Sequence, residues 1–291
     1  MKTRIATIVS LCLAIQFAVH GQTLETSSAR YNDTNYALYL DSQAYSVTPL
    51  DTSVFSVTYD LAIMVDTLKR ETFNSMYILL VGSHVNKFLP FAKFTYDRYT
   101  RKSPYNFGGD MIHNQHHVFY YEAIYQDRRT GMTTITERLC EDDFITTEDT
   151  PVQEWTITSH RKDIGEYECN LAECDFRGRH YYAWYAEDIP MPYGPWKLGG
   201  LPGLIVSAYD SDHQYEYSMV SIEQSLWPIF RTDYNYIEAD RRRLNRHVNE
   251  ILHKPLVYMD KHFHLTTRRV DPGSLFKERD LVYQYDAIEK D

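Results

Sequence analysis

Apolar and aromatic side chains alternate with polar ones along most of this chain. The clearest run is 54–66, where valine, phenylalanine, tyrosine, leucine and isoleucine fall on every second residue. Successive side chains of a β-strand point to opposite faces, so this period predicts a half-buried strand. Further strands are predicted at 76–81, 118–125, 133–139, 152–158, 166–176, 179–186, 204–209, 214–222, 255–267 and 281–285.

The aromatic content supports a mainly β protein. The chain has 25 Tyr, 13 Phe and 4 Trp, and such rings fit a pleated surface and pair across strands. Residues 238–253 differ, because their apolar residues recur at helical spacing until Pro255 stops the run. The expected fold is mainly β: a large curved antiparallel sheet, half-barrel or barrel-like, with one packed amphipathic helix near 238–253.

Residues 1–21 are predicted to be a secretory signal peptide. Lys2 and Arg4 precede an uncharged stretch at 5–19, and Gly21 offers a small residue for cleavage. The alternative is a membrane anchor, but the stretch is shorter than the ~20 apolar residues that span a bilayer. We therefore expect a signal peptide at 1–21 and a single β-rich domain at 22–291.

The charge balance argues against a nucleic-acid-binding protein. Removal of Lys2 and Arg4 with the signal peptide takes the formal net charge from −10 to −12, whereas phosphate binding needs a clustered basic surface. The local exception is the basic run at 241–243 with Arg246. It falls on the predicted helix, where a solvated face is expected.

Three cysteines, Cys140, Cys169 and Cys174, remain after cleavage. Cys169 and Cys174 are five apart in a predicted strand, so their side chains should point to opposite faces and should not pair. A bridge from Cys140 to either of them is one alternative in an oxidising compartment. Three free thiols are the other.

The most specific pattern in the chain lies at 176–205. Here Phe-Arg-Gly-Arg, Ala-Trp-Tyr, Ile-Pro, Gly-Pro-Trp-Lys and Gly-Leu-Pro-Gly-Leu-Ile follow one another, the last at 200–205. In order and spacing these motifs resemble the GLPGLI family of exported bacterial proteins, found chiefly in the Bacteroidota. The resemblance covers residues 57–222. It implies export, a β-rich fold and work in the periplasm or at the outer membrane, but no biochemical activity.

Two interpretations of this pattern follow from its residues. The prolines and glycines at 189–203 favour a loop that folds back and clamps Trp184 and Trp196 against the sheet. Alternatively, the cations and rings form a patch that recognises a carboxylate, a phosphate-bearing lipid or a partner loop. The candidate contact residues are Arg177, Arg179, Trp184, Tyr193, Trp196 and Lys197.

Signals for catalysis are sparse. His113, His116 and His117 are candidate metal ligands, but a metal needs three or four converging groups, and exposed loop histidines are the simpler interpretation. The sequence has no His-Glu-x-x-His, no Gly-x-Ser-x-Gly and no phosphate-binding glycine pattern. It therefore assigns no catalytic residue, no cofactor and no resident metal.

The leading hypothesis is a non-enzymatic binding or partner module, exported to the periplasm or associated with the outer membrane. Its expected partner is an envelope protein, a peptide or a lipid, with no nucleic acid and no transmembrane span after signal cleavage. One alternative is a metal-dependent hydrolase that uses the histidine cluster. The other is an accessory subunit of an outer-membrane transporter.

Overall fold

The computed structural model describes residues 46–91, 93–95, 97, 120–139, 142–246 and 288–290. Several predictions concern residues outside these ranges: the signal peptide, Cys140, the histidine cluster at His113, His116 and His117, and the strands at 255–267 and 281–285. In the described part, no helix is long and apolar enough to cross a membrane.

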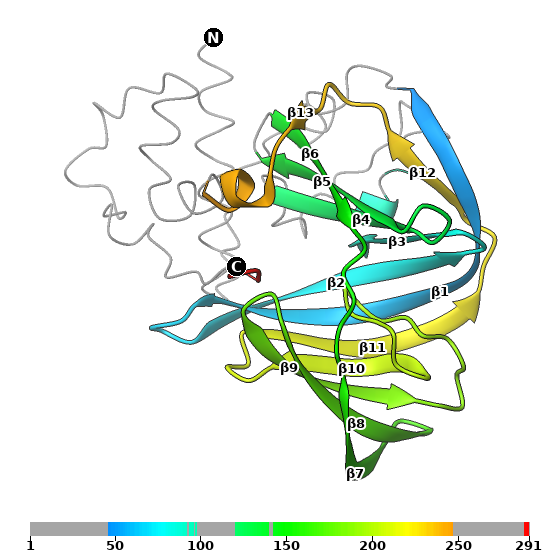
Figure 1. The fold of residues 1–291 in the computed structure, drawn as a ribbon, viewed down its shortest axis with the longest axis vertical. Helices are drawn as coiled ribbons and strands as arrows, with labels where there is room; N and C mark the ends of the chain where they lie inside the picture. The colour runs from blue at the N-terminus through cyan, green and yellow to red at the C-terminus, as the bar shows by residue number, and fades with distance from the viewer. Residues whose placement is uncertain are drawn as a thin grey trace, which may run out of the picture.

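Thirteen strands form one sheet within the described residues (Figure 1). Hydrogen bonds join them in the order β13-β6-β5-β4-β3-β2-β1-β11-β10-β9-β8-β7, and β12 pairs with β1 beside this path. All neighbours are antiparallel except the pair of β13 and β6. The strands are β1 (Val47–Asp66), β2 (Glu71–Gly82), β3 (Val85–Pro90), β4 (Tyr120–Asp127), β5 (Met132–Leu139), β6 (Asp142–Asp149), β7 (Thr156–Ile164), β8 (Tyr167–Phe176), β9 (Arg179–Ala186), β10 (Leu204–Asp210), β11 (Tyr215–Gln224), β12 (Pro228–Thr232) and β13 (Ile237–Glu238).

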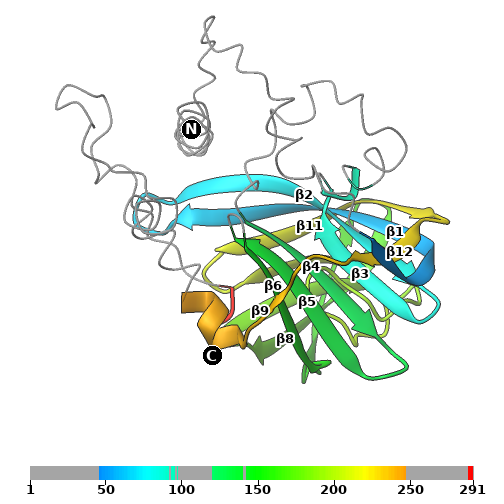
Figure 2. The same cartoon turned by 90° about the horizontal axis from the view of Figure 1, so that it is seen from above.

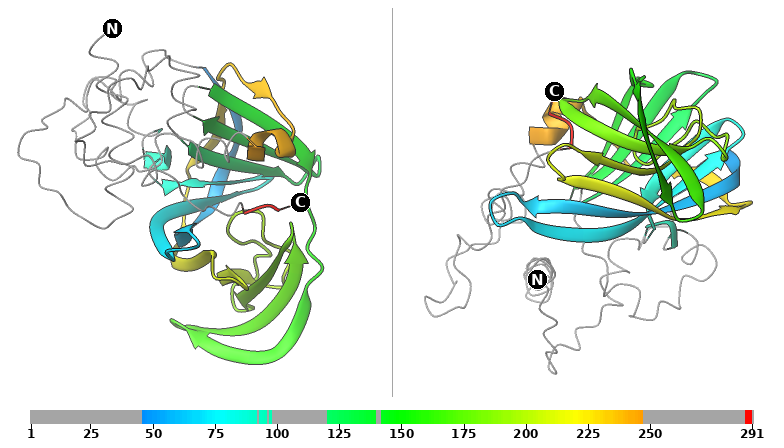
Figure 3. Two further views of the ribbon diagram at one scale, coloured as in Figure 1. Left: turned by 90° about the vertical axis from the view of Figure 1, so that its left-hand side faces the viewer. Right: turned by 90° about the horizontal axis from the view of Figure 1, so that it is seen from below.

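Strand β1 joins the two halves of the sheet. Its N-terminal part pairs with β12, and the rest lies between β2 and β11. The register with β11 shifts between Thr58 and Tyr59, and such a bulge bends and twists a strand. We call β3–β6 with β13 wing A, and β7–β11 wing B; Figures 1 and 3 show both. The expected large curved sheet is confirmed, and it is open.

The main core joins residues of both wings. Ile124 and Ile135 of wing A belong to the same buried cluster as Tyr181 and Tyr185 of wing B. Tyr59 of β1 lies between them, fully buried, and its hydroxyl donates to the carbonyl oxygen of Ile205 at 2.8 Å. The tyrosine surplus is thus partly sheet filling, as predicted.

Smaller clusters cover the opposite faces of the strands. On one face, Phe94 of the helical residues 93–95 and Ile229 of β12 pack with residues of β2, β3 and β4. On the other, Cys169 packs with Trp184, whereas Cys174 belongs to the main core. The prediction that Cys169 and Cys174 face opposite ways and do not pair is confirmed.

The predicted helix begins at residue 241 and is described as far as 246. The Asp240 carboxylate accepts a hydrogen bond from the Arg243 amide at 2.7 Å, which caps the first turn. Leu244 is buried beneath it. Residues 247–253 of the expected helix lie outside the described ranges.

The loop at 187–203, which we call the motif loop, connects β9 to β10. Trp196 is the second residue of a four-residue turn, in which the Leu198 amide donates a hydrogen bond to the Pro195 carbonyl at 3.0 Å. Its φ is 55°, an unusual value for a residue with a side chain. Trp196 is 3% exposed and contacts the rings of Phe176 and Tyr181. The motif loop therefore clamps Trp196 in the main core.

Gly203 allows the close return of the motif loop. A Cβ at this position would lie 2.0 Å from the carbonyl oxygen of Ala186 and 2.9 Å from Cα of Glu187. Both are backbone atoms, so no side-chain rotation relieves the clash. Gly203, the second glycine of the hexapeptide, is therefore required because of the limited space and not because of its φ.

Gly203→Ala should therefore lower the free energy of unfolding by at least ~3 kcal/mol, because the two backbone segments must separate. Gly131→Ala is the control, since Gly131 has a φ of 68° but open space around it, and its expected loss is only ~1 kcal/mol. Urea denaturation of both variants measures the difference. Equal losses would contradict the close-approach argument.

Candidate functional site

Charged side chains from both wings meet in the interior beside the motif loop. They come from β4, β5 and β6, from the β8–β9 turn, from the motif loop, from the helix at 241–246 and from the C-terminal residues. We call this group the ion cluster. Its members are Glu122, Glu137, Glu148, Arg177, Lys197, Arg241 and Glu289.

Lys197 supplies the cation from the motif loop. It is 1% exposed, and its Nζ lies 2.7 Å from Oε1 of Glu148 and 2.5 Å from Oε1 of Glu289. The Gln153 side chain fixes the loop around it by donating to the Lys197 carbonyl and accepting from the Gly199 amide, both at 3.1 Å. Trp155 Nε1 also donates to the Gly199 carbonyl. The lysine is thus held by its backbone as well as its charge.

Arg241 joins three carboxylates. Its Nε lies 2.6 Å from Oε2 of Glu289, its Nη2 lies 3.2 Å from Oε2 of Glu122, and its Nη1 contacts Glu137. Glu122 and Glu137 face each other directly on β4 and β5, where like charges destabilise a sheet. Arg241 offsets that repulsion. The prediction of a solvated basic face is wrong for Arg241, and Arg242 is exposed as expected.

The β8–β9 hairpin supplies two arginines. Arg177 and Gly178 have φ values of 51° and 74°, the two positive values that a type I′ turn requires. Arg177 Nη2 lies 2.9 Å from Oε2 of Glu148. Arg179 is buried next to the ion cluster, where its Nη1 lies 2.7 Å from Oδ2 of Asp210.

The C-terminal residues 288–290 lie in this site, beside the helix at 241–246 (Figures 1 and 2). The Ile288 carbonyl accepts from Arg179 Nε at 3.0 Å, and the Lys290 amide donates to the Arg177 carbonyl at 3.0 Å. The Glu289 side chain has no exposed surface. A short segment of the chain is therefore held through its backbone and its carboxylate together.

The charge count of the ion cluster bears on its protonation. Four carboxyl groups face three cations. Burial raises the pKa of Glu137 to about 8, with Glu122 and Glu289 adding to the rise and Arg241 and Lys197 opposing it. A proton on Glu137 balances the charges.

The pKa shifts of Glu289 and Arg241 favour the charged forms of these two groups. Burial alone would raise the pKa of Glu289, but Arg241 and Lys197 hold it below its usual range. Burial alone would lower the pKa of Arg241, and Glu137, Glu122 and Glu289 instead raise it well above its ordinary value. Glu289 and Arg241 are therefore the charged pair at the centre of the site.

The structure brings four of the six predicted contact residues together. Arg177, Arg179 and Lys197 contact residues 288–290, and the Trp196 ring centroid lies 5.8 Å from Lys197 Nζ. Tyr193 lies in the same loop, where the guanidinium of Arg128 stands 5.2 Å from its ring centroid.

Trp184 lies apart from this group. It belongs to a cluster on the opposite face of β9, with Lys162 Nζ 4.1 Å from its ring centroid. The two tryptophans thus lie on opposite faces of the sheet, and Ile189 of the motif loop packs against both of their clusters.

Sequence reasoning missed the acidic half of the site. Glu122, Glu137, Glu148 and Glu289 lie far apart along the chain and belong to no motif. One signal was available for Glu137. This residue lies inside the predicted strand at 133–139, after threonine and isoleucine residues and with no turn residue nearby. Nothing local distinguishes Glu289.

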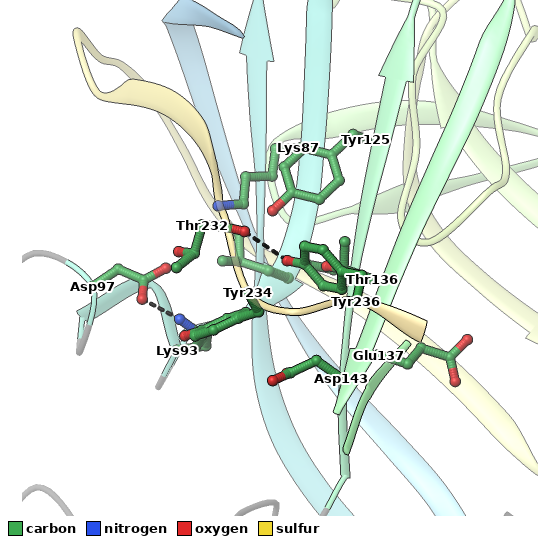
Figure 4. A pocket seen from close by; sticks show the side chains of 12 residues that line it. Lys87, Lys93, Asp97, Tyr125, Thr136, Glu137, Asp143, Thr232, Tyr234 and Tyr236 are labelled. Atoms are coloured by element: carbon green, nitrogen blue, oxygen red, sulfur yellow. Dashed lines mark hydrogen bonds and ion pairs between the residues drawn. The ribbon is translucent and has the colours of Figure 1, made fainter. Parts of the chain in front are cut away.

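A small pocket lies on the other side of wing A (Figure 4). Its volume is about 10 Å³, close to the minimum for one water molecule. Glu137 borders it, but its side chain points away, toward the ion cluster (Figure 4). The space therefore suits no organic ligand. Other lining residues include Lys87, Lys93, Asp97, Tyr125, Tyr234 and Tyr236.

In the ranges that the structure describes, no three His, Cys, Asp or Glu side chains are arranged to hold a metal ion. No protein-family model and no curated protein matches the chain. Among solved structures, the chain is similar to PNGF-II in its P21 and C2 crystal forms, with TM-scores of 0.44 and 0.43 and 16% sequence identity. Each match covers 68% of this chain and 33% of PNGF-II, so the chain spans about a third of the matched structures.

Glu137→Gln should change how stability depends on pH. In the wild-type protein the raised pKa of Glu137 gives stability that is fully present below the unfolded pKa of about 4.3 and is lost as pH rises through about 8. The amide does not titrate. The variant should therefore gain on the order of 4 kcal/mol relative to wild type between about pH 5 and about pH 9, at about 1.4 kcal/mol for each pH unit from 5 to 8.

Urea denaturation at both pH values measures this gain. Glu168→Gln is the matched control, because Glu168 is exposed and forms an ion pair with the exposed side chain of Arg161. Parallel pH profiles of Glu137→Gln and wild type would show that Glu137 is ionised throughout.

Proposed function

We propose that this protein is an exported, non-enzymatic binding module that holds a carboxylate-bearing peptide segment of a partner in the cell envelope. One observation carries the proposal: Arg177, Arg179, Lys197 and Arg241 converge on the backbone and carboxylate of residues 288–290. Such a site recognises peptide geometry and charge at once.

The geometry favours binding over catalysis. Glu137 has a raised pKa, as general acids do, but it is 2% exposed and faces Arg241. Glu289 is also fully enclosed by cations. The pocket that Glu137 borders has a volume of about 10 Å³, which is too small for a substrate.

Export is supported by the sequence. The predicted signal peptide and the resemblance to the GLPGLI family both favour the periplasm or the outer membrane. The partner is therefore an envelope protein or a peptide released there. A carboxylate is the group that Lys197 and Arg241 fit best, and Arg179 adds a donor for a backbone carbonyl.

Arg177 is the accessible edge of the site, since its side chain is 24% exposed beside Glu148. Arg177→Glu should weaken partner binding at least about tenfold, because it places a like charge next to the incoming carboxylate. Arg161→Glu is the matched control: it makes the same charge change on an exposed side chain of β7.

The measurement starts with immobilised mature protein, residues 22–291, and a solubilised envelope fraction. Retained proteins are purified and titrated against wild type and both variants by tryptophan fluorescence. Saturable binding that Arg177→Glu alone weakens is expected. No saturable partner, or equal weakening by both variants, would exclude this site as the binding surface.

A further inference from the structure

We infer that the C-terminal segment Ile288–Glu289–Lys290 is an exchangeable resident ligand, so the chain occupies its own binding site until a partner segment of the same chemistry displaces it. The ligand class is a peptide with an apolar residue followed by glutamate. This inference rests on the proposed function and adds its ligand and its regulation.

The site recognises each part of the segment separately. The Ile288 side chain packs against the main core. The Glu289 carboxylate binds Lys197 and Arg241. The backbone carbonyl of Glu289 accepts a hydrogen bond from Asn245 Nδ2 at 3.3 Å. Cβ of Lys290 lies 2.7 Å from where a Cβ of Gly178 would stand, so the glycine gives the segment its close approach. The site therefore selects a ligand for its apolar side chain, for its carboxylate and for the path of its backbone.

The segment belongs to no strand of the sheet. Its hydrogen bonds and ion pairs to Asn245, Arg179 and Lys197 reach residues 44 or more positions away and belong to no strand ladder of the described residues. Departure of the segment therefore breaks hydrogen bonds and ion pairs without unzipping the sheet. An integral core strand does not have this property.

The cations keep partners when the segment leaves. Lys197 retains Glu148, and Arg241 retains Glu122 and Glu137. A buried cation without any partner costs several kcal/mol, and the ion cluster avoids that state. The same excess of carboxylates that raises the pKa of Glu137 lets the site open.

The competition favours the resident segment. A ligand on the same chain acts at an effective concentration of about millimolar. A free peptide of equal affinity therefore binds the intact protein weakly. Loss of the resident carboxylate should remove this block.

A labelled peptide with the sequence of residues 286–291, Asp-Ala-Ile-Glu-Lys-Asp, is titrated by fluorescence anisotropy against the full mature chain and against Glu289→Gln. Glu289→Gln should bind the peptide at least about tenfold more tightly than wild type. The same peptide with glutamine in place of its glutamate should bind neither protein. Adding Lys197→Met to Glu289→Gln should abolish binding.

Ile288→Ser provides a second route, because it weakens docking of the segment and leaves every ion-pairing group in place. Folded variants that bind no peptide, or that bind both peptides equally, would overturn the inference. So would loss of cooperative unfolding in both variants, since the segment would then be part of the core.

The two proposals fail separately. An envelope partner bound without peptide exchange would remove only the resident-ligand inference. Peptide exchange without any envelope partner would remove only the proposed function.

Discussion

The buried charge of Lys197 is the constraint on which the rest of the site depends. The motif loop places this ammonium in the interior with 1% exposure, where an unpaired charge costs several kcal/mol. Glu148 of wing A and Glu289 of the C-terminal segment both supply a carboxylate to it. One ion-pair requirement therefore links wing A, wing B and the C-terminal residues.

The motif loop itself is built mainly by packing. Gly203 lets two backbone segments touch, Leu204 and Ile205 fill the main core, and Trp196 is clamped against Phe176. The hexapeptide thus sets the path of the loop, and the lysine ahead of it provides the chemistry. Packing and charge are separate contributions of one short sequence.

Alternation predicted most of the sheet because most strands bury one face. It failed at β3, whose six residues are all buried and include Lys87, so no period is visible. It failed at β6, where acids stand at both ends. The strand expected at 152–158 begins instead at Thr156, because Gln153 and Trp155 turn inward to hold the motif loop.

The sequence by itself determined the β-rich class, the hairpin at Arg177 and Gly178, and the cationic residues of the motif, since these depend on local period and turn chemistry. Only the tertiary structure decided which acids meet those cations. Arg241 has the sequence context of a solvated arginine, yet it contacts Glu137 and Glu122, 104 and 119 residues away. Pairing over such separations follows from how the wings close, and no local pattern records it.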